Sequence, residues 1–249
     1  MFLMLLLTAA ISAVRGMWSP CGLSMLSSLN PVSERARGHR FWVTAYWYVA
    51  GALAGGALLG VGCALGAAGF GRLGADSTAV WTVALAGAAV AALSDARVGG
   101  WSLPMHPRQV DERWVVSYRR WIYAAGYGVQ IGTGFATYVM TAGVYLTALL
   151  AILTGSIGQA LAAGFVFGLV RGASIGVAAC ARDPERLRVL LGRVDAWTRG
   201  SALVAGGWCV AVAATAAWAV AGAPLAIAVA AVLVLLIAWS LTTRVVTYS

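Results

Sequence analysis

Residues 15–22 read RGMWSPCG, and they stand inside a run of residues that is otherwise apolar. MFLMLLLTAAISAV precedes this stretch and LSML follows it, so residues 2–29 as a whole can enter a bilayer. At about 1.5 Å per residue, a helix of that length is too long for one straight crossing. A proline in a helix interior also removes a backbone hydrogen bond. The stretch therefore predicts a first membrane helix that is broken near its middle.

The composition of the chain indicates a polytopic membrane protein. Of its 249 residues, 61% are hydrophobic and 10% are charged, whereas about a quarter of a soluble domain is charged. The formal net charge is +9, and all 17 basic residues are arginine, most of them in short segments between apolar runs. Such a distribution sets orientation in a membrane and does not point to nucleic-acid binding.

The apolar runs predict an all-α fold of about seven transmembrane helices. The fourth run is overlong like the first and contains QIGTG at 130–134, so we expect a second broken helix there. Two three-helix units that each begin with a broken helix are typical of an inverted repeat. The predicted spans are 2–29, 41–66, 78–95, 121–153, 156–181, 200–221 and 224–243. The predicted divisions are a first repeat at 1–95, a cytoplasmic amphipathic linker at 96–120, a second repeat at 121–221, and an extra C-terminal helix with its tail at 222–249.

The arginines predict the orientation of these spans. They gather in segments 30–40, 96–120 and 182–199 and at Arg244, all on one side of a seven-span arrangement, whereas the other side holds only Arg72. The positive-inside rule then places the N-terminus outside and the C-terminus in the cytoplasm. The composition is rich in Ala, Gly, Val and Arg, as in proteins of GC-rich bacteria, so we expect the plasma (inner) membrane of a bacterium. A cleaved signal peptide is the alternative for the N-terminus, but no positive charge precedes its apolar run.

Two connections predict amphipathic helices on the cytoplasmic surface. Residues 101–121 alternate arginines with aromatic residues, and residues 182–197 place leucines and a valine on one face. Arginines would face anionic headgroups of the lipid bilayer while apolar side chains enter the interface. Docking of a membrane or cytoplasmic protein at 96–120 and 182–199 is the alternative.

The Ser-Pro-Cys motif at 19–21, the later broken span and the three-plus-three layout resemble the transmembrane domain of DsbD/CcdA-type thiol-disulfide carriers, within the LysE-like transporter superfamily. In that family the cysteine of this motif pairs with a cysteine in the fourth span and carries electrons across the membrane. Cys21 matches the first of these cysteines, and the fourth span here has none. The resemblance thus implies the architecture and leaves the redox chemistry open. Cys63, Cys180 and Cys209 are expected to be small apolar core residues.

Two arginines inside predicted spans indicate a candidate site. An arginine at the centre of a bilayer costs about 2.5–3.5 kcal/mol on insertion scales, so it tends to face a cavity or a partner. Asp95 is the only acidic residue close to a span, which leaves a positive site that a small anion would satisfy. Pairing of the arginines with Asp95 or with backbone carbonyls is the alternative. The predicted substrate-binding residues are Arg15, Ser19, Cys21, Gln130, Thr133, Thr137 and Arg171.

The main functional prediction is therefore a transporter or exporter of a small anion, sulfur-containing anions included. The alternatives are a thiol-redox carrier that uses Cys21 and a non-catalytic membrane subunit or assembly factor. An enzyme is not expected, because the spans contain no histidine, no paired carboxylates and no metal-ligand cluster. His39 and His106 are expected to be solvated residues of the cytoplasmic loops, and no cofactor or metal is expected.

Overall fold

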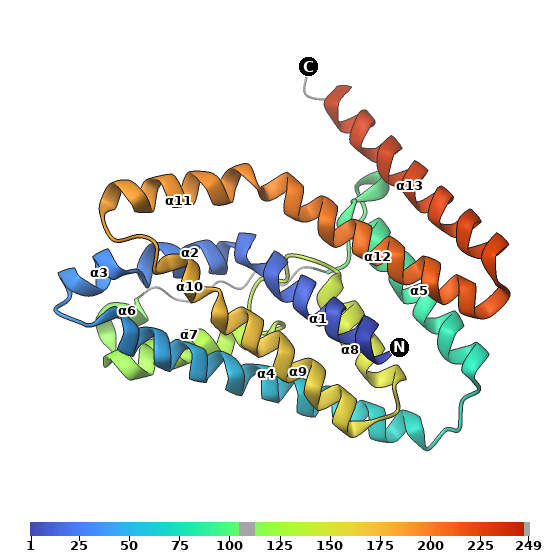
Figure 1. Ribbon diagram of the computed structural model, residues 1–249, viewed down its shortest axis with the longest axis horizontal. Helices are drawn as coiled ribbons and strands as arrows, with labels where there is room; N and C mark the ends of the chain where they lie inside the picture. The colour runs from blue at the N-terminus through green and yellow to red at the C-terminus, as the bar shows by residue number, and fades with distance from the viewer. Residues whose placement is uncertain (105–112, 247–249) are drawn as a thin grey trace.

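The computed structural model describes residues 1–104 and 113–246, with side chains described as far as Ser240. Within these ranges every regular element is a helix, as the apolar runs predict. The helices form one bundle from which the C-terminal helix projects (Figure 1). In the described part of the chain, five helices are long and apolar enough to cross a membrane, or six if a bent pair at the N-terminus is one span. The protein is therefore an all-helical membrane protein.

The first predicted span is broken as expected. Helix α1 (Phe2–Arg15) continues into the short helix η1 (Gly16–Trp18), and helix α2 (Pro20–Ser28) leaves at an angle of 66°. Ser19 between them has extended backbone angles, φ −70° and ψ 155°, as the residue before a proline prefers. Pro20 then occupies the first turn of α2, where its missing N–H costs nothing. The local sequence thus explains the break.

The fourth predicted span is not one helix. Helix α7 (Arg120–Thr133) ends at Gly134, whose φ of +75° breaks the helix. Residues 134–142 are irregular, and helix α8 (Gly143–Leu153) follows. At about 1.5 Å per residue, neither helix reaches the roughly 30 Å of a hydrocarbon core. The prediction of seven membrane helices is therefore not reproduced at this position.

Helix α4 (Phe41–Gly71) packs against both α7 and helix α9 (Ile157–Ala173). Glycines let the backbones of these helices touch. A Cβ added to Gly56 would lie 2.6 Å from the Cα of Gly168 on α9, and one added to Gly128 on α7 would lie 2.7 Å from the amide nitrogen of Ala52. Small residues allow this close approach of membrane helices.

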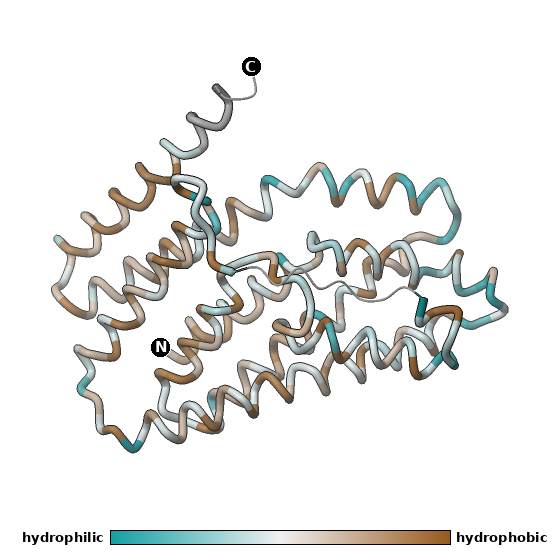
Figure 2. The backbone as a smooth tube through the Cα atoms, turned by 180° about the vertical axis from the view of Figure 1, so that it is seen from behind, coloured by the Kyte–Doolittle hydropathy of each residue, from teal (hydrophilic) through white to brown (hydrophobic). Residues whose placement is uncertain are grey.

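The other long helices form the second side of the bundle. Helix α5 (Ser77–Asp95) packs against helix α12 (Thr198–Ala221), which turns at Gly222 into helix α13 (Ala223–Val246). An apolar groove of about 340 Å³ lies between α5 and α13. Figure 2 shows hydrophobic residues along these helices and hydrophilic ones at the ends of the bundle.

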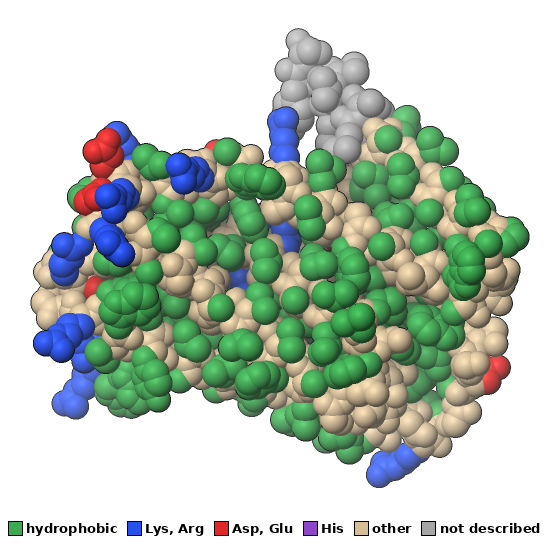
Figure 3. Space-filling model, in the orientation of Figure 1, with side chains coloured by type: hydrophobic (Ala, Val, Ile, Leu, Met, Phe, Trp, Pro, Cys, Tyr) green, Lys and Arg blue, Asp and Glu red, His purple; other side chains and the backbone are tan. Residues whose placement is uncertain are grey.

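The charged end of the bundle is built by shorter helices, and arginine and acidic side chains gather there on the face shown in Figure 3. Helix α11 has an apolar face as predicted, but Leu191 and Val194 on that face pack into a cluster with Met25 and Leu26 of α2. The face expected to enter the lipid interface is thus partly covered by protein. The shorter helices at this end are α3 (Pro31–Ala36), α6 (Trp114–Ser117), α10 (Ile175–Ala178) and α11 (Pro184–Ala196), whereas η2 (Val98–Gly100) follows α5 and contacts α13.

Parts of the predicted loops lie outside the described residues. They are His106 and Arg108 in the linker at 96–120, and the side chain of Arg244.

Candidate functional site

The two arginines of the predicted site are both buried, with 7% and 4% of Arg15 and Arg171 exposed. They contact different residues. Arg15, the last residue of α1, donates a hydrogen bond from Nη1 to the Ser201 hydroxyl of α12 at 3.1 Å and interacts electrostatically with Asp95. Arg171 lies on α9, on the other side of the bend. Each guanidinium therefore has its own partners.

Arg171 binds the bend of the first helix. Its guanidinium lies against Gly16, where a Cβ would come within 2.5 Å of the Cζ atom of Arg171. Its Nε donates to the Ile131 carbonyl of α7 at 3.4 Å, and it interacts electrostatically with Tyr48 and Cys21. A side chain at position 16 would force the guanidinium to shift, so Gly16 and Arg171 pack together and join α9, α7 and the bend.

Ser19 and Cys21 stand at the start of α2. The Ser19 hydroxyl accepts a hydrogen bond from the Gly22 amide at 3.1 Å and donates one to the Gly16 carbonyl at 2.7 Å. This single side chain therefore caps α2 and satisfies a carbonyl left open by the break. Cys21 is completely buried. All four cysteines lie in the described part of the chain, and none of them forms a disulfide bond.

The three polar residues predicted from the fourth span are not arranged on one helix face. Gln130 and Thr133 lie on α7, and Thr133 donates to the Val129 carbonyl of its own helix at 2.7 Å. Thr137 lies in the irregular segment after α7 and is 1% exposed, with no hydrogen-bond partner for its hydroxyl among the described residues. The helical spacing on which the prediction rests stops at Gly134.

Asp95 binds the C-terminal end of the same irregular segment. It ends α5 and accepts hydrogen bonds from the Thr141 hydroxyl and from the Ala142 amide, the latter at 2.6 Å. An acidic group at the N-terminus of a helix is favourable, and Ala142 is the N-cap residue directly before α8. Asp95 thus attaches α8 to α5 and is mainly a partner of α8, with Arg15 acting on it electrostatically.

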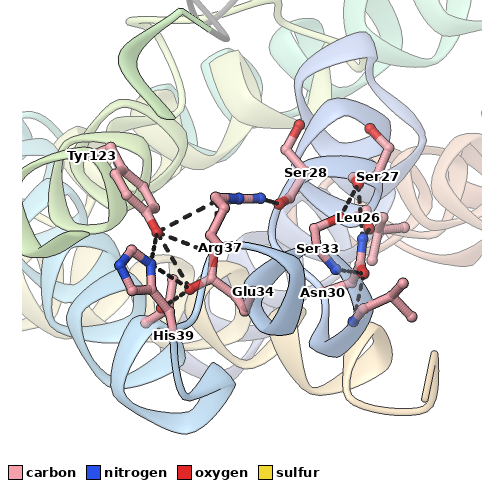
Figure 4. A network of polar contacts seen from close by, with 11 residues as sticks. Leu26, Ser27, Ser28, Asn30, Ser33, Glu34, Arg37, His39 and Tyr123 are labelled. Atoms are coloured by element: carbon pink, nitrogen blue, oxygen red, sulfur yellow. Dashed lines mark hydrogen bonds and ion pairs between the residues drawn. The ribbon is translucent and has the colours of Figure 1, made fainter. Parts of the chain in front are cut away.

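A second polar cluster lies at the charged end of the bundle (Figure 4), and the sequence does not predict it. Glu34 of α3 is completely buried. It forms an ion pair with Arg37 at 2.8 Å, accepts a hydrogen bond from the Tyr123 hydroxyl of α7 at 3.0 Å, and accepts another from the Thr44 hydroxyl of α4. His39 joins the cluster, with Nδ1 3.3 Å from the Tyr123 hydroxyl. Glu34 therefore fastens α3 to both α4 and α7.

Asn30 supports this cluster from its own side. Its side chain accepts hydrogen bonds from the amides of Val32 and Ser33 and donates to the Leu26 and Ser27 carbonyls, so it ends α2 and begins α3 (Figure 4). The Asn-Pro pair at 30–31 is the one local signal that could have indicated this helix start. His39, expected to be fully solvated, is instead 34% exposed in its side chain beside a buried carboxylate.

In the part of the chain that the structure describes, no group of three or more His, Cys, Asp or Glu side chains could hold a metal ion. The polar groups at the bend and around Glu34 mainly hold helices together. These groups hold the bent first helix and the short helices of the charged end in fixed positions.

No family model matches the chain, and no solved structure matches it. The chain is similar to curated proteins that are each named methylamine utilization protein MauF. The relative from Paracoccus denitrificans is 33% identical over 184 residues, which are 71% of this chain and 64% of the relative. The relative from Paracoccus versutus is 33% identical over 177 residues, 68% of this chain and 62% of the relative. The relative from Methylorubrum extorquens is 33% identical over 147 residues, 58% of this chain and 51% of the relative.

The matched part of this chain thus spans less than two thirds of the length of these relatives. The similarities correct two predictions. The resemblance to DsbD/CcdA carriers and LysE-like transporters is wrong, because the relatives are named methylamine utilization proteins. The interpretation as a transporter of a small anion is wrong for the same reason, and the thiol-carrier alternative loses the resemblance on which it depends.

Proposed function

We propose that this chain is a non-catalytic membrane accessory protein of a methylamine utilization system. The observation that carries the proposal is its similarity to MauF of Paracoccus denitrificans, at 33% identity over 184 residues. Among the functions expected from the sequence, the membrane subunit or assembly factor fits such relatives best.

The buried polar groups support a role in holding a fixed shape. Arg15 donates to Ser201, Arg171 donates to the Ile131 carbonyl, and Ser19 caps α2. Groups that are bound within the protein stabilise the bundle, and a buried polar group is expensive when its partner is lost. The membrane helices are therefore proposed as a scaffold that presents surfaces to other proteins.

The partner surface is proposed at the charged end, on segment 182–199. Helix α11 packs Leu191 and Val194 inward, and its arginines are exposed on the outside. The Trp18 indole of the bend donates to the Val194 carbonyl at 2.6 Å, so α11 is held by the first helix as well as by α12. A firmly placed row of arginines suits an acidic segment of a partner protein. Segment 96–120 is a second part of this surface.

The arrangement in the membrane is proposed as two inverted three-helix repeats at 1–95 and 121–221, joined by 96–120 and followed by an extra helix at 222–249. Helix packing supports this arrangement. The second helices of the two units, α4 and α9, pack on each other, and so do the third helices, α5 and α12. The broken first helix of each unit packs on the second helix of the other, α1 on α9 and α7 on α4. This is the pattern that a two-fold relation between the units requires. The N-terminus is proposed outside and the C-terminus in the cytoplasm of the bacterial inner membrane.

The proposal is tested by deleting the gene in a bacterium that grows on methylamine. We expect the deletion strain to stop growing on methylamine and to grow normally on succinate, and the intact gene to restore growth. Normal growth of the deletion strain on methylamine would overturn the role. A matched assay uses the purified chain in sealed vesicles: uptake of labelled methylamine by these vesicles would contradict a non-catalytic accessory role.

The partner surface is tested in the same strain with Arg188→Glu/Arg193→Glu, two exposed changes on α11. We expect the variant to accumulate in the membrane at the normal level and to fail to restore growth. Arg72→Glu, at the opposite end of the bundle, is the control and should restore growth. Full growth with the α11 variant would contradict a partner surface on α11.

A further inference from the structure

One exposed surface lies apart from the core and from the arginines of α11, and it includes the last two residues of segment 96–120. It lies where α4 and α7 begin, and we call it the interfacial patch: Arg40, Tyr46, Trp47, Arg119, Arg120 and Trp121.

The two helices that carry the patch run parallel to each other. A Cβ on Gly51 of α4 would meet the Ala125 carbonyl of α7, and one on Gly55 would meet the Val129 carbonyl. Four residues along α4 thus correspond to four along α7, which is possible only for parallel helices in register. Arg120, five residues before Ala125, therefore lies beside Tyr46, so α7 begins about 7.5 Å further along than α4. Arg40 lies beyond Arg119 and Arg120 at the same end of the bundle.

The aromatic side chains of the patch face outward next to one another. Tyr46 is 66% exposed, Trp47 37% and Trp121 51%. The rings of Trp47 and Trp121 lie 6.1 Å apart across the two helices, and the rings of Tyr46 and Trp47 lie 5.6 Å apart. The opposite face of α4 buries Thr44 and Tyr48. The aromatic stripe is therefore not part of the core, and Trp and Tyr at this level of a membrane helix prefer the lipid interface.

The arginines of the patch lie at the outer edge of this stripe. Arg40 directly precedes α4, Arg119 directly precedes α7, and Arg120 is the first residue of α7. None of the three guanidiniums makes a hydrogen bond or an ion pair with another residue in the described ranges. Glu34, the buried acid of this end, is occupied by Arg37. Three guanidiniums without acidic partners border a flat aromatic surface.

We propose that the interfacial patch binds an anionic phospholipid, with Arg40, Arg119 and Arg120 on its phosphate and with Trp47 and Trp121 against its glycerol and upper acyl chain. A guanidinium binds a phosphodiester through paired N–H donors. The aromatic rings add apolar contact that a soluble phosphate ion cannot use, which is why the occupant is a lipid. Beside the arginines of α11, Leu191 and Val194 pack on α2. Val189 and Trp197 are exposed there, but among the described residues no pair of exposed rings like Trp47 and Trp121 lies next to these arginines.

The experiment measures lipid binding to the purified full chain by native mass spectrometry in detergent, with phosphatidylglycerol titrated against phosphatidylcholine. We expect the wild-type chain to prefer phosphatidylglycerol. Arg40→Gln/Arg119→Gln/Arg120→Gln should lower its affinity by at least about tenfold, since each arginine near an anionic surface contributes about fivefold. Trp47→Leu/Trp121→Leu should lower it too, with all three arginines intact.

The matched control is Arg182→Gln/Arg188→Gln/Arg193→Gln, which removes the same charge from exposed positions on and before α11 at the same end of the bundle. We expect this control to keep the wild-type affinity. An equal fall in the control would show general charge attraction and overturn the proposal. Unchanged binding in the arginine variant of the patch would overturn it as well. So would displacement of phosphatidylglycerol by inorganic phosphate, because the site would then belong to the free ion. Thermal unfolding of each variant without lipid verifies that the fold is kept.

Discussion

A methyl group added at Gly56 should push helices α4 and α9 apart. Gly56 of α4 faces α9, and a Cβ there would lie 2.6 Å from the Cα of Gly168 and nearer still to the Gly164 carbonyl oxygen. Ordinary contact begins at 3.4 Å and the Gly164 oxygen would lie at 2.4 Å, so Gly56→Ala requires α4 and α9 to move apart by about 1.0 Å, the difference between these two distances. Overpacking of this kind costs about 1–3 kcal/mol.

Two effects act against each other in this variant. Alanine is favoured over glycine in a helix by about 0.5–1 kcal/mol. The clash exceeds this gain, so we expect a net loss of about 0.5–2 kcal/mol. Gly62→Ala is the control on the same helix, because nothing lies within 4 Å of a Cβ at that position. Gly62→Ala should keep the stability of the parent chain or raise it by the roughly 0.5–1 kcal/mol by which a helix favours alanine over glycine.

The assay is thermal unfolding of the two purified variants in the same detergent. At about 2–4 °C per kcal/mol for a chain of this size, Gly56→Ala should unfold several degrees below Gly62→Ala. Equal melting temperatures would refute the reasoning, since they would mean that α4 and α9 do not touch through their backbones.

Three further predictions concern the polar groups. Glu34→Gln should lower the free energy of unfolding by about 3 kcal/mol, because it removes one partner of a buried ion pair. Glu185→Gln, on the exposed face of α11, should change it by less than about 0.5 kcal/mol. Chemical unfolding measures both values, and equal effects would contradict the buried network. Ser19→Ala should cost about 1 kcal/mol through loss of the helix cap, and Ser19→Thr should recover most of it; a melting temperature unchanged in Ser19→Ala would exclude the cap. Cys21→Ser should still support growth on methylamine, and mass spectrometry without reductant should find no disulfide at Cys21; loss of growth together with such a disulfide would restore a redox role.

The break in the first helix could be predicted because its signals are local. Ser19 and Pro20 act through the backbone of the residues next to them, so their effect does not depend on the rest of the fold. Gly16 differs, because it makes room for Arg171 of α9. The fourth span is harder to predict. QIGTG indicates a break, but the length of the irregular segment depends on Asp95, which holds the start of α8 from another helix.

The site could be predicted only in part. Hydropathy identifies Arg15 and Arg171 as buried, and both are. The residues that each guanidinium contacts depend on the rotation and packing of α1 and α9. The hydropathy pattern of the sequence does not determine that packing. Glu34 could not be recognised at all, since it lies in an arginine-rich loop typical of solvated surface and its partner Tyr123 is 89 residues away.

The hydrogen bond between Arg15 and Ser201 also sets an order of events during translation, because its two residues are 186 positions apart. At about 5–20 residues per second, Arg15 leaves the ribosome roughly 10–40 s before Ser201 exists. Throughout that time the first helix carries a charge whose transfer into the bilayer costs about 2.5–3.5 kcal/mol. The nascent N-terminal segment therefore has reason to wait at the translocon or at the membrane surface until the later helices arrive. The first helix to be made would be among the last to take its final place.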